Sequence, residues 1–193
     1  MRVSKEQAAE NRARILSEAS RLFREKGLAG VGVDKLTEAA GLTHGSLYSQ
    51  FGSKERLTAA ALEHALARGA LSRLADTGLP PREALSATIE RYLSPAHRDA
   101  PGQGCALAAL ACEIPRQGDA VREVFTEGLR GKIDRLAGLI GDGDEVAGRE
   151  GALAMVSSLV GALVLARAVD DPSLSDDLLT AATKMLKQTV KAG

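Results

Sequence analysis

The residues best suited to chemistry lie between positions 43 and 54. Hydrogen-bonding side chains are spaced there along one short predicted helix. This helix begins after Thr43, and its buried face is marked by Leu47 and Phe51, which are four residues apart. The residues left on the outer face are His44, Ser46, Ser49 and Gln50. Short side chains that donate and accept hydrogen bonds suit the edges of bases in the major groove of DNA.

A second predicted helix, from Val33 to Ala40, precedes this one and would hold it in place. The two are joined by a turn at residues 41–43, and a pair of short helices with such a turn outlines a helix-turn-helix. Gly41 allows the chain to reverse within the turn. Gly45 has no side chain at the start of this helix, where the helix would approach the DNA backbone closely. The motif is therefore predicted over residues 32–51.

Residues 14–57 resemble the DNA-binding head of the TetR family of bacterial transcriptional regulators. That family has a helix with Phe-x-x-x-Gly, then a short apolar helix ending in Ala-Gly, then Ser/Thr-x-Gly-x-Leu-Tyr-x-x-Phe followed by Lys. The matching residues are Phe23, Gly27, Leu36, Ala40, Gly41, Thr43, Gly45, Leu47, Tyr48, Phe51 and Lys54. The resemblance implies that Thr43, Tyr48 and Lys54 contact phosphates, while the outer-face residues face bases or nearby backbone.

Two positions depart from the family pattern. Gly32 stands where the family usually has a Ser or Thr that caps the second helix and touches a phosphate, so that contact is in doubt. Thr37 stands where a small Ala is usual, a difference expected to affect packing. Apart from these positions, the first 56 residues carry ten basic and seven acidic side chains, a modest positive excess that permits contact with phosphates.

Helical periodicity continues through the rest of the chain, and no alternating strand pattern appears. We predict an all-α protein of about nine helices, with a three-helix head at residues 4–68 and a larger helical domain at 69–193. In the second domain the expected helices are 82–97, 104–114, 119–140, 144–169 and a last one capped by Ser175. The resemblance implies that this domain binds a small molecule and dimerises.

The predicted helix at 144–169 is apolar on too many faces for the surface of a monomer. Its small residues, such as Gly151 and Gly161, would let a partner helix approach. With the last helix it is expected to form a four-helix interface across a two-fold axis, which implies a palindromic DNA operator. The alternative is a helix buried within one chain.

The expected ligand site has few aromatic residues, since only Tyr92 and Phe125 lie outside the head. We expect an aliphatic cavity with few polar anchors, and name Tyr92, Cys105 and Phe125 as candidate ligand-binding residues. Cys105 opens a predicted helix, where a thiol can become a reactive thiolate, so it is either a sensor of oxidants and electrophiles or a small packing residue. Cys112 is too distant along an intact helix for a disulfide with it.

Other chemistry finds little support in the sequence. Three histidines at positions 44, 64 and 97 have no metal-ligand spacing, and no catalytic constellation or cofactor motif is present. The loop at 141–144 matches neither a phosphate-binding nor a calcium-binding pattern. The charged N-terminus is not a secretory signal, and the longest uncharged run, 151–166, is short for a membrane span, so a cytoplasmic protein is expected.

These features predict a homodimeric DNA-binding regulator, a repressor released from its operator by a small-molecule effector, and not an enzyme. Three alternatives stay open. The chain could sense oxidants through Cys105, or it could bind DNA constitutively without an effector. It could also be a helical carrier or enzyme that merely retains the head.

Overall fold

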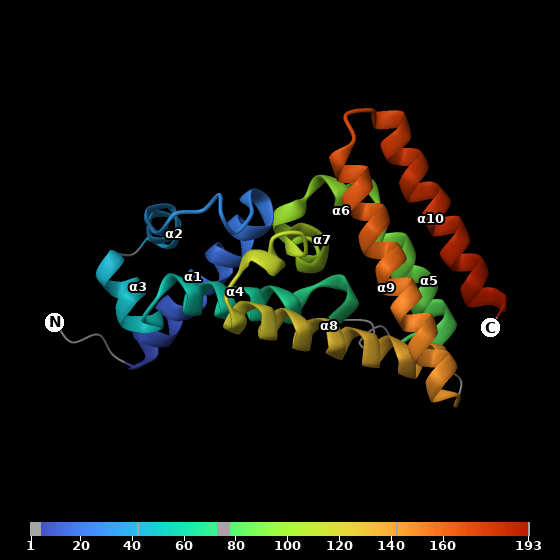
Figure 1. Cartoon of the computed structure of the whole chain (residues 1–193), viewed down its shortest axis with the longest axis horizontal. Coiled ribbons are helices and arrows are strands. Elements are labelled where there is room, and N and C mark those ends of the chain that lie inside the picture. Colours follow the sequence, from blue (N-terminus) through green and yellow to red (C-terminus); the bar gives the residue numbers. More distant parts are fainter. Residues whose placement is uncertain (1–4, 42, 73–77, 142, 193) are drawn as a thin grey trace.

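The computed structural model describes residues 5–41, 43–72, 78–141 and 143–192. Within these ranges the chain forms ten α-helices and no strand, so the all-α prediction is confirmed (Figure 1). The helices are α1 (Lys5–Lys26), α2 (Val33–Ala40), α3 (His44–Phe51), α4 (Lys54–Arg68), α5 (Pro81–Tyr92), α6 (Pro95–Asp99), α7 (Ala106–Leu110), α8 (Asp119–Ile140), α9 (Glu145–Ala168) and α10 (Pro172–Ala192). Residue 4 of the predicted head, Leu42 of the turn and Asp142 of the loop lie outside the described residues.

Helices α1 to α3 pack together at one end of the molecule (Figure 1). The long helix α1 buries Ile15, Ala19 and Phe23. Gly27 directly follows its last residue, and its φ of +76° is a conformation that glycine adopts without strain. Ser20 on the buried side of α1 donates a hydrogen bond to the carbonyl oxygen of Ala61 at 2.8 Å. This bond ties α1 to α4.

Helix α4 leads from the head into the rest of the molecule, where it runs alongside α8 (Figure 1). Ser53 caps its first turn, because its side chain accepts a hydrogen bond from the backbone N–H of Arg56 at 3.1 Å. Farther along, α4 and α8 meet at Gly128. A Cβ at that position would lie only 2.6 Å from Cδ1 of Leu66, so glycine is what permits the close approach.

The far end of the molecule is formed by α9 and α10, which pack against each other and against α8 and α5 (Figure 1). Asp144 caps α9 by accepting hydrogen bonds from the backbone N–H groups of Val146 and Ala147, each at 3.0 Å. In the part of the chain described, α9 is the one helix whose length and composition would allow it to cross a membrane. Only 33% of its apolar window is buried, so much of this helix faces outward.

Two predicted helices are shorter than the sequence indicated. The one expected at 82–97 is divided, because Leu93 ends α5 and Ser94 caps α6, with Pro95 at its first position. The one expected at 104–114 contains only the short helix α7, followed by turns. Cys105 and Cys112 therefore do not share an intact helix, and both are free thiols.

The predicted start of the last helix was wrong. Ser175 does not cap it: α10 begins at Pro172, and Asp171 accepts the hydrogen bonds of the first turn from Ser173 N at 2.9 Å and Leu174 N at 3.2 Å. Ser175 is instead buried, and its hydroxyl donates to the carbonyl oxygen of Ala166 at 2.7 Å. Both Asp and Ser are good caps, and here the aspartate directly before the proline takes that place.

Candidate functional site

Helix α3 presents a polar face to solvent and an apolar face to the head. Leu47 is fully buried and Phe51 is 6% exposed, whereas Tyr48 between them is 47% exposed. Thr43 begins the helix, since its hydroxyl accepts a hydrogen bond from the backbone N–H of Ser46 at 3.4 Å. Leu47 and Phe51 thus lie inward and His44 and Ser49 lie outward, as the four-residue spacing predicted. Gln50, also predicted on the outer face, is half-buried, and its Oε1 is buried without a hydrogen-bond partner.

The predicted DNA-contacting residues gather on α3, its cap and the first turn of α4. The exposed members are Thr43, His44, Gly45, Tyr48 and Ser49, and the half-buried members are Ser46, Gln50 and Lys54. The free N–H groups of the first turn of α4 lie beside Lys54, and such groups favour an anion. The surface therefore combines hydrogen-bonding groups along α3 with a site suited to a phosphate at the start of α4.

His44 has a partner that the sequence did not indicate. Its Nε2 lies 2.5 Å from a carboxylate oxygen of Asp34 on α2, so the pair links the two helices of the motif. Both side chains are mostly exposed. A contact between His44 and a base would have to compete with this hydrogen bond.

Arg12 on α1 supports the end of α3. Its Nη1 donates a hydrogen bond to the carbonyl oxygen of Gln50 at 3.1 Å, and its guanidinium lies 4.3 Å from the ring centroid of Phe51. A cation at a helix C-terminus is favourable both as a hydrogen-bond donor and toward the helix dipole. The contact spans 38 residues, so no local sequence pattern could have predicted it.

The two departures from the family pattern have visible consequences. Gly32 begins α2 with an extended backbone and offers no side-chain hydrogen bond to it. Thr37 is buried, and its hydroxyl donates to the carbonyl oxygens of Val33 at 3.1 Å and Asp34 at 2.9 Å. The hydroxyl that Thr37 adds at this position is therefore hydrogen-bonded within α2.

Two contacts join the end of α1 to the larger part of the molecule, and the sequence predicted neither. The carboxylate of Glu113 accepts hydrogen bonds from the backbone N–H groups of Leu28 and Ala29, at 3.0 to 3.1 Å. Nε of Arg24 donates to the carbonyl oxygen of Gly102 at 2.9 Å. These bonds hold the last turn of α1 against the segments on either side of α7.

The three candidate ligand-binding residues do not form one site. Tyr92 and Cys105 are both buried and adjacent, and burial raises the pKa of the Tyr92 phenol well above its ordinary value. His97 stands beside them, with its ring 4.7 Å from that of Tyr92, and its Nε2 accepts a hydrogen bond from the backbone N–H of Cys105 at 3.0 Å. Phe125 lies apart on α8 and is half-buried.

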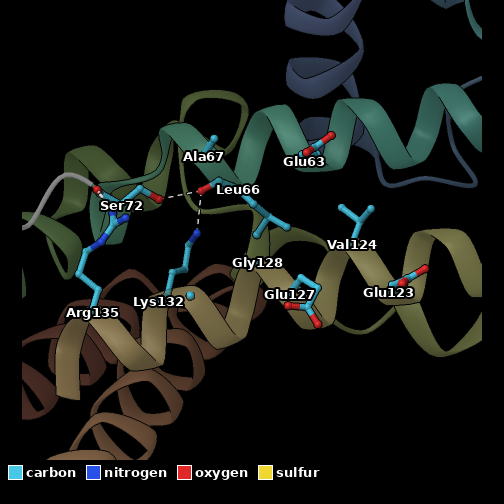
Figure 2. A pocket seen from close by; sticks show the side chains of 11 residues that line it. Glu63, Leu66, Ala67, Ser72, Glu123, Val124, Glu127, Gly128, Lys132 and Arg135 are labelled. Carbon is cyan, nitrogen blue, oxygen red and sulfur yellow. Dashed lines mark hydrogen bonds between the residues drawn. The ribbon is translucent and has the colours of Figure 1, made fainter. Parts of the chain in front are cut away.

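A cavity of about 560 Å³ lies between α4 and α8 (Figure 2). Leu66, Ala67 and Val124 supply apolar surface, and Gly131 leaves space, since a Cβ there would meet nothing within 4 Å. At one end, the ammonium of Lys132 reaches across to the carbonyl oxygen of Leu66 at 2.6 Å. Lys132 is only 6% exposed, and burial lowers its pKa.

A second cavity of about 690 Å³ lies among α5, α8, α9 and α10. Its lining is mainly apolar and includes Leu139, Met155 and Leu186. This cavity has the aliphatic character expected from the sequence, whereas the cavity beside α4 combines apolar walls with charged ends. Neither cavity includes the three candidate ligand-binding residues.

The residues that the structure describes form no recognisable metal-binding site. Among the described residues, no three side chains of His, Cys, Asp and Glu come together as potential metal ligands.

The arrangement of α2 and α3 is that of a helix-turn-helix in an all-α protein. The family model described as "Bacterial regulatory proteins, tetR family" matches residues 15–61, which include both helices. Residues 15–61 therefore carry a DNA-binding head of the TetR-family type.

Curated relatives extend the similarity beyond the head. The HTH-type transcriptional repressor DhaR of a Mycobacterium species is 31% identical over 122 residues, which are 62% of this chain and 58% of DhaR. The repressor NemR of Escherichia coli is 27% identical over 70% of each chain. The match to the regulator TtgR of Pseudomonas putida covers 30% of that protein. This chain therefore spans 58% of DhaR and 30% of TtgR, less than two thirds of either relative.

Solved structures share the whole fold. The crystal structure of reduced Escherichia coli NemR has a TM-score of 0.79 at 25% identity, covering 93% of this chain and 96% of that one. A TetR-family regulator from Cytophaga hutchinsonii has a TM-score of 0.80 at 24% identity, covering 100% and 98%. The second likeness concerns the fold alone.

Proposed function

We propose that this protein is a homodimeric transcriptional repressor that binds a palindromic DNA operator and is released by a small-molecule effector. The observation that carries the proposal is α3, which exposes its polar face while Leu47 and Phe51 anchor it to the head. A rigidly held helix with short polar side chains is what readout in a major groove requires. DhaR and NemR, both named as repressors, favour this sign of regulation. A cytoplasmic location follows from binding the chromosome.

The proposed roles of the surface residues divide into two kinds. Thr43, Tyr48 and Lys54 would contact phosphates and set the position of the helix, while the remaining outer-face residues would read bases. Phosphate contacts contribute affinity that falls with salt, and base contacts contribute the sequence preference. His44 contributes to readout only if the base competes with Asp34.

Dimerisation is supported by the outward faces of α9 and α10. Leu153 and Leu165 on α9 are 44% and 53% exposed, and Leu174 and Met185 on α10 are 46% and 47% exposed. Large apolar side chains in such rows mark surfaces that another protein covers. A two-fold pairing of these helices would bring two copies of α3 to successive major grooves.

The effector is proposed to bind the cavity between α4 and α8, because α4 is the element that joins this cavity to the head. Release from DNA requires the effector to bind the DNA-incompetent state more tightly than the competent one. The cavity among α5, α8, α9 and α10 does not touch α4, so it offers no comparable path.

The alternative of a sensor thiol has less support. Cys105 is only 2% exposed, so an electrophile could reach it only after local opening. Cys112 is exposed and lies in a turn after α7, and its thiol is free. We retain packing as the role of Cys105. Constitutive DNA binding would leave the cavity beside α4 without a ligand.

The proposal is tested by selecting bound sequences from random duplex DNA with the full chain. The expected result is a two-fold symmetric site with half-sites about one helical turn, 34 Å, or somewhat more apart. Ser49→Ala and Gln50→Ala should change the preferred bases. Lys54→Met should weaken binding to all sequences and lower the salt slope by about one.

The matched control is Arg91→Met, which removes an exposed cation from α5, at the end of the molecule away from α3 (Figure 1). This variant should bind as the wild type does. A purified chain that shows no symmetric preference at moderate salt would overturn the proposal.

A further inference from the structure

We propose that the cavity between α4 and α8 binds an aliphatic monoanion whose carboxylate pairs with the ammonium of Lys132. This inference rests on the proposed function for its regulatory consequence, but the binding site itself stands independently of it. It names the chemical class of the effector and the contact through which that molecule acts on α4.

The basic end of the cavity is built around Lys132. The side chain is nearly buried, and among the described residues its one hydrogen-bond partner is the carbonyl oxygen of Leu66. An ammonium carries three donors, and a buried cation is costly unless an anion or several acceptors surround it. Arg135 lines the same end, where it donates to the carbonyl oxygen of Ser72.

The walls between the two ends set the character of the ligand's body. Leu66, Ala67 and Val124 are apolar, and Gly131 leaves open space on the α8 side. Glu127 of α8 also lines the cavity, and its carboxylate is paired with Arg130. The absence of aromatic rings from the lining favours an aliphatic body over a stacked aromatic one. A volume of about 560 Å³ lies within the range of ordinary small-molecule pockets.

The opposite end of the cavity limits the ligand to one negative charge. Glu63 on α4 and Glu123 on α8 both lie there, away from Lys132 (Figure 2). A second carboxylate on the ligand would approach these two carboxylates and be repelled. A dianion of the same length should therefore bind more weakly than a monoanion.

Binding would act on the last turn of α4. The carbonyl oxygen of Leu66 accepts hydrogen bonds from Lys132 and from the hydroxyl of Ser72, at 2.6 and 2.7 Å. A carboxylate that accepts from one of the two remaining donors of the ammonium draws the Lys132 side chain toward the ligand, which weakens one of the two hydrogen bonds that hold the end of α4. Because α4 begins at Lys54, directly after α3, a shift of α4 reaches the DNA-binding surface.

The test uses isothermal titration calorimetry on the full chain with four probes: octanoate, 1-octanol, octylammonium and octanedioate. Octanoate should bind at least about tenfold more tightly than each of the others, the margin expected for one charge pair in a partly desolvated site. Lys132→Met should remove this preference for octanoate while leaving the weak binding of 1-octanol unchanged. Arg122→Met, on the same helix, should bind like the wild type.

A second variant covers the case in which Lys132→Met does not fold. Gly131→Leu adds a side chain that meets no atom near its Cβ and occupies the cavity. It should abolish octanoate binding and leave the circular dichroism spectrum unchanged. Equal affinity for octanoate and 1-octanol, undiminished octanoate binding by either variant, or no binding of octanoate would overturn the inference.

Failure of this inference is distinguishable from failure of the proposed function. A chain that selects a symmetric DNA site but does not prefer octanoate retains its function and loses the assigned ligand class. A chain that prefers octanoate through Lys132 but selects no DNA site retains the ligand site and loses the function. Where both hold, octanoate should release the selected DNA from the wild type but not from Gly131→Leu.

Discussion

The carboxylate of Glu113 accepts the backbone N–H of Leu28 with both oxygens, at 3.1 Å to Oε1 and 3.0 Å to Oε2. Leu28 follows the end of α1, and Glu113 follows α7, so one side chain joins the head to the rest of the molecule across 85 residues. Gly27 makes the approach possible, because a Cβ there would lie on the Glu113 carboxylate. The orientation of the head therefore depends on a residue far outside it.

Removing this contact should loosen the end of α1. We expect Glu113→Ala to lower the free energy of unfolding by about 1–2 kcal/mol, since hydrogen bonds to a charged group are lost. Glu113→Gln keeps one acceptor oxygen and should lose less. Urea denaturation measures the change, and amide exchange at Leu28 and Ala29 should accelerate. Glu123→Ala, an exposed glutamate on α8, is the control, and a loss equal to that of Glu113→Ala would contradict the assignment.

Two glycines on α8 should respond oppositely to the same substitution. Gly128→Ala places a Cβ against the side chain of Leu66, so it should separate α4 from α8 and destabilise the protein by about 1–3 kcal/mol. Gly131→Ala meets no atom within 4 Å and should stabilise by about 0.5–1 kcal/mol through helix propensity. Thermal and urea denaturation measure both. Equal effects of the two substitutions would show that the close approach at Gly128 is not required.

His97 should make stability depend on pH. Its Nδ1 lies 2.6 Å from the carbonyl oxygen of Tyr92 and its Nε2 accepts from Cys105 N, an arrangement that fits the neutral ring with its proton on Nδ1. Burial lowers the pKa of His97 in the folded protein. The unfolded chain therefore binds the proton first, and the free energy of unfolding should fall as pH drops below about 6.5 and level off below the folded pKa.

The measurement for His97 is the unfolding free energy of the wild type and of His97→Gln between pH 8 and pH 5. The glutamine variant lacks this titrating group, so its stability should fall less over that range. An identical pH dependence in the two proteins would mean that His97 is protonated equally in the folded and unfolded states.

A charge on the outward face of α9 should prevent dimerisation. Leu165 is 53% exposed in the single chain, and Leu165→Glu would bury a carboxylate if two copies pair through this face. We expect the dimer to weaken on the order of 100-fold or more. Sedimentation at several concentrations measures this, with Ala120→Glu on the exposed first turn of α8 as the control. A variant that dimerises like the wild type would place the interface elsewhere.

Local patterns predicted the motif of α2 and α3 well. The spacing of Leu47 and Phe51, the cap at Thr43 and the glycine at position 41 act within one or two turns of helix, so each can be recognised from neighbouring residues. The start of α10 was predicted wrongly because Ser175 and Asp171 are both good caps. The choice depended on the buried bond from Ser175 to Ala166, which joins two helices.

The amino-acid sequence by itself determined the all-α class, the helix-turn-helix and the inward positions of Leu47 and Phe51 on α3. These follow from periodicity and capping, which are short-range properties of the chain. Only the tertiary structure decided that Glu113 holds Leu28, that Asp34 engages His44, and that Lys132 closes one end of a cavity against α4. Such contacts depend on how helices distant in sequence pack together, and no local pattern records that packing.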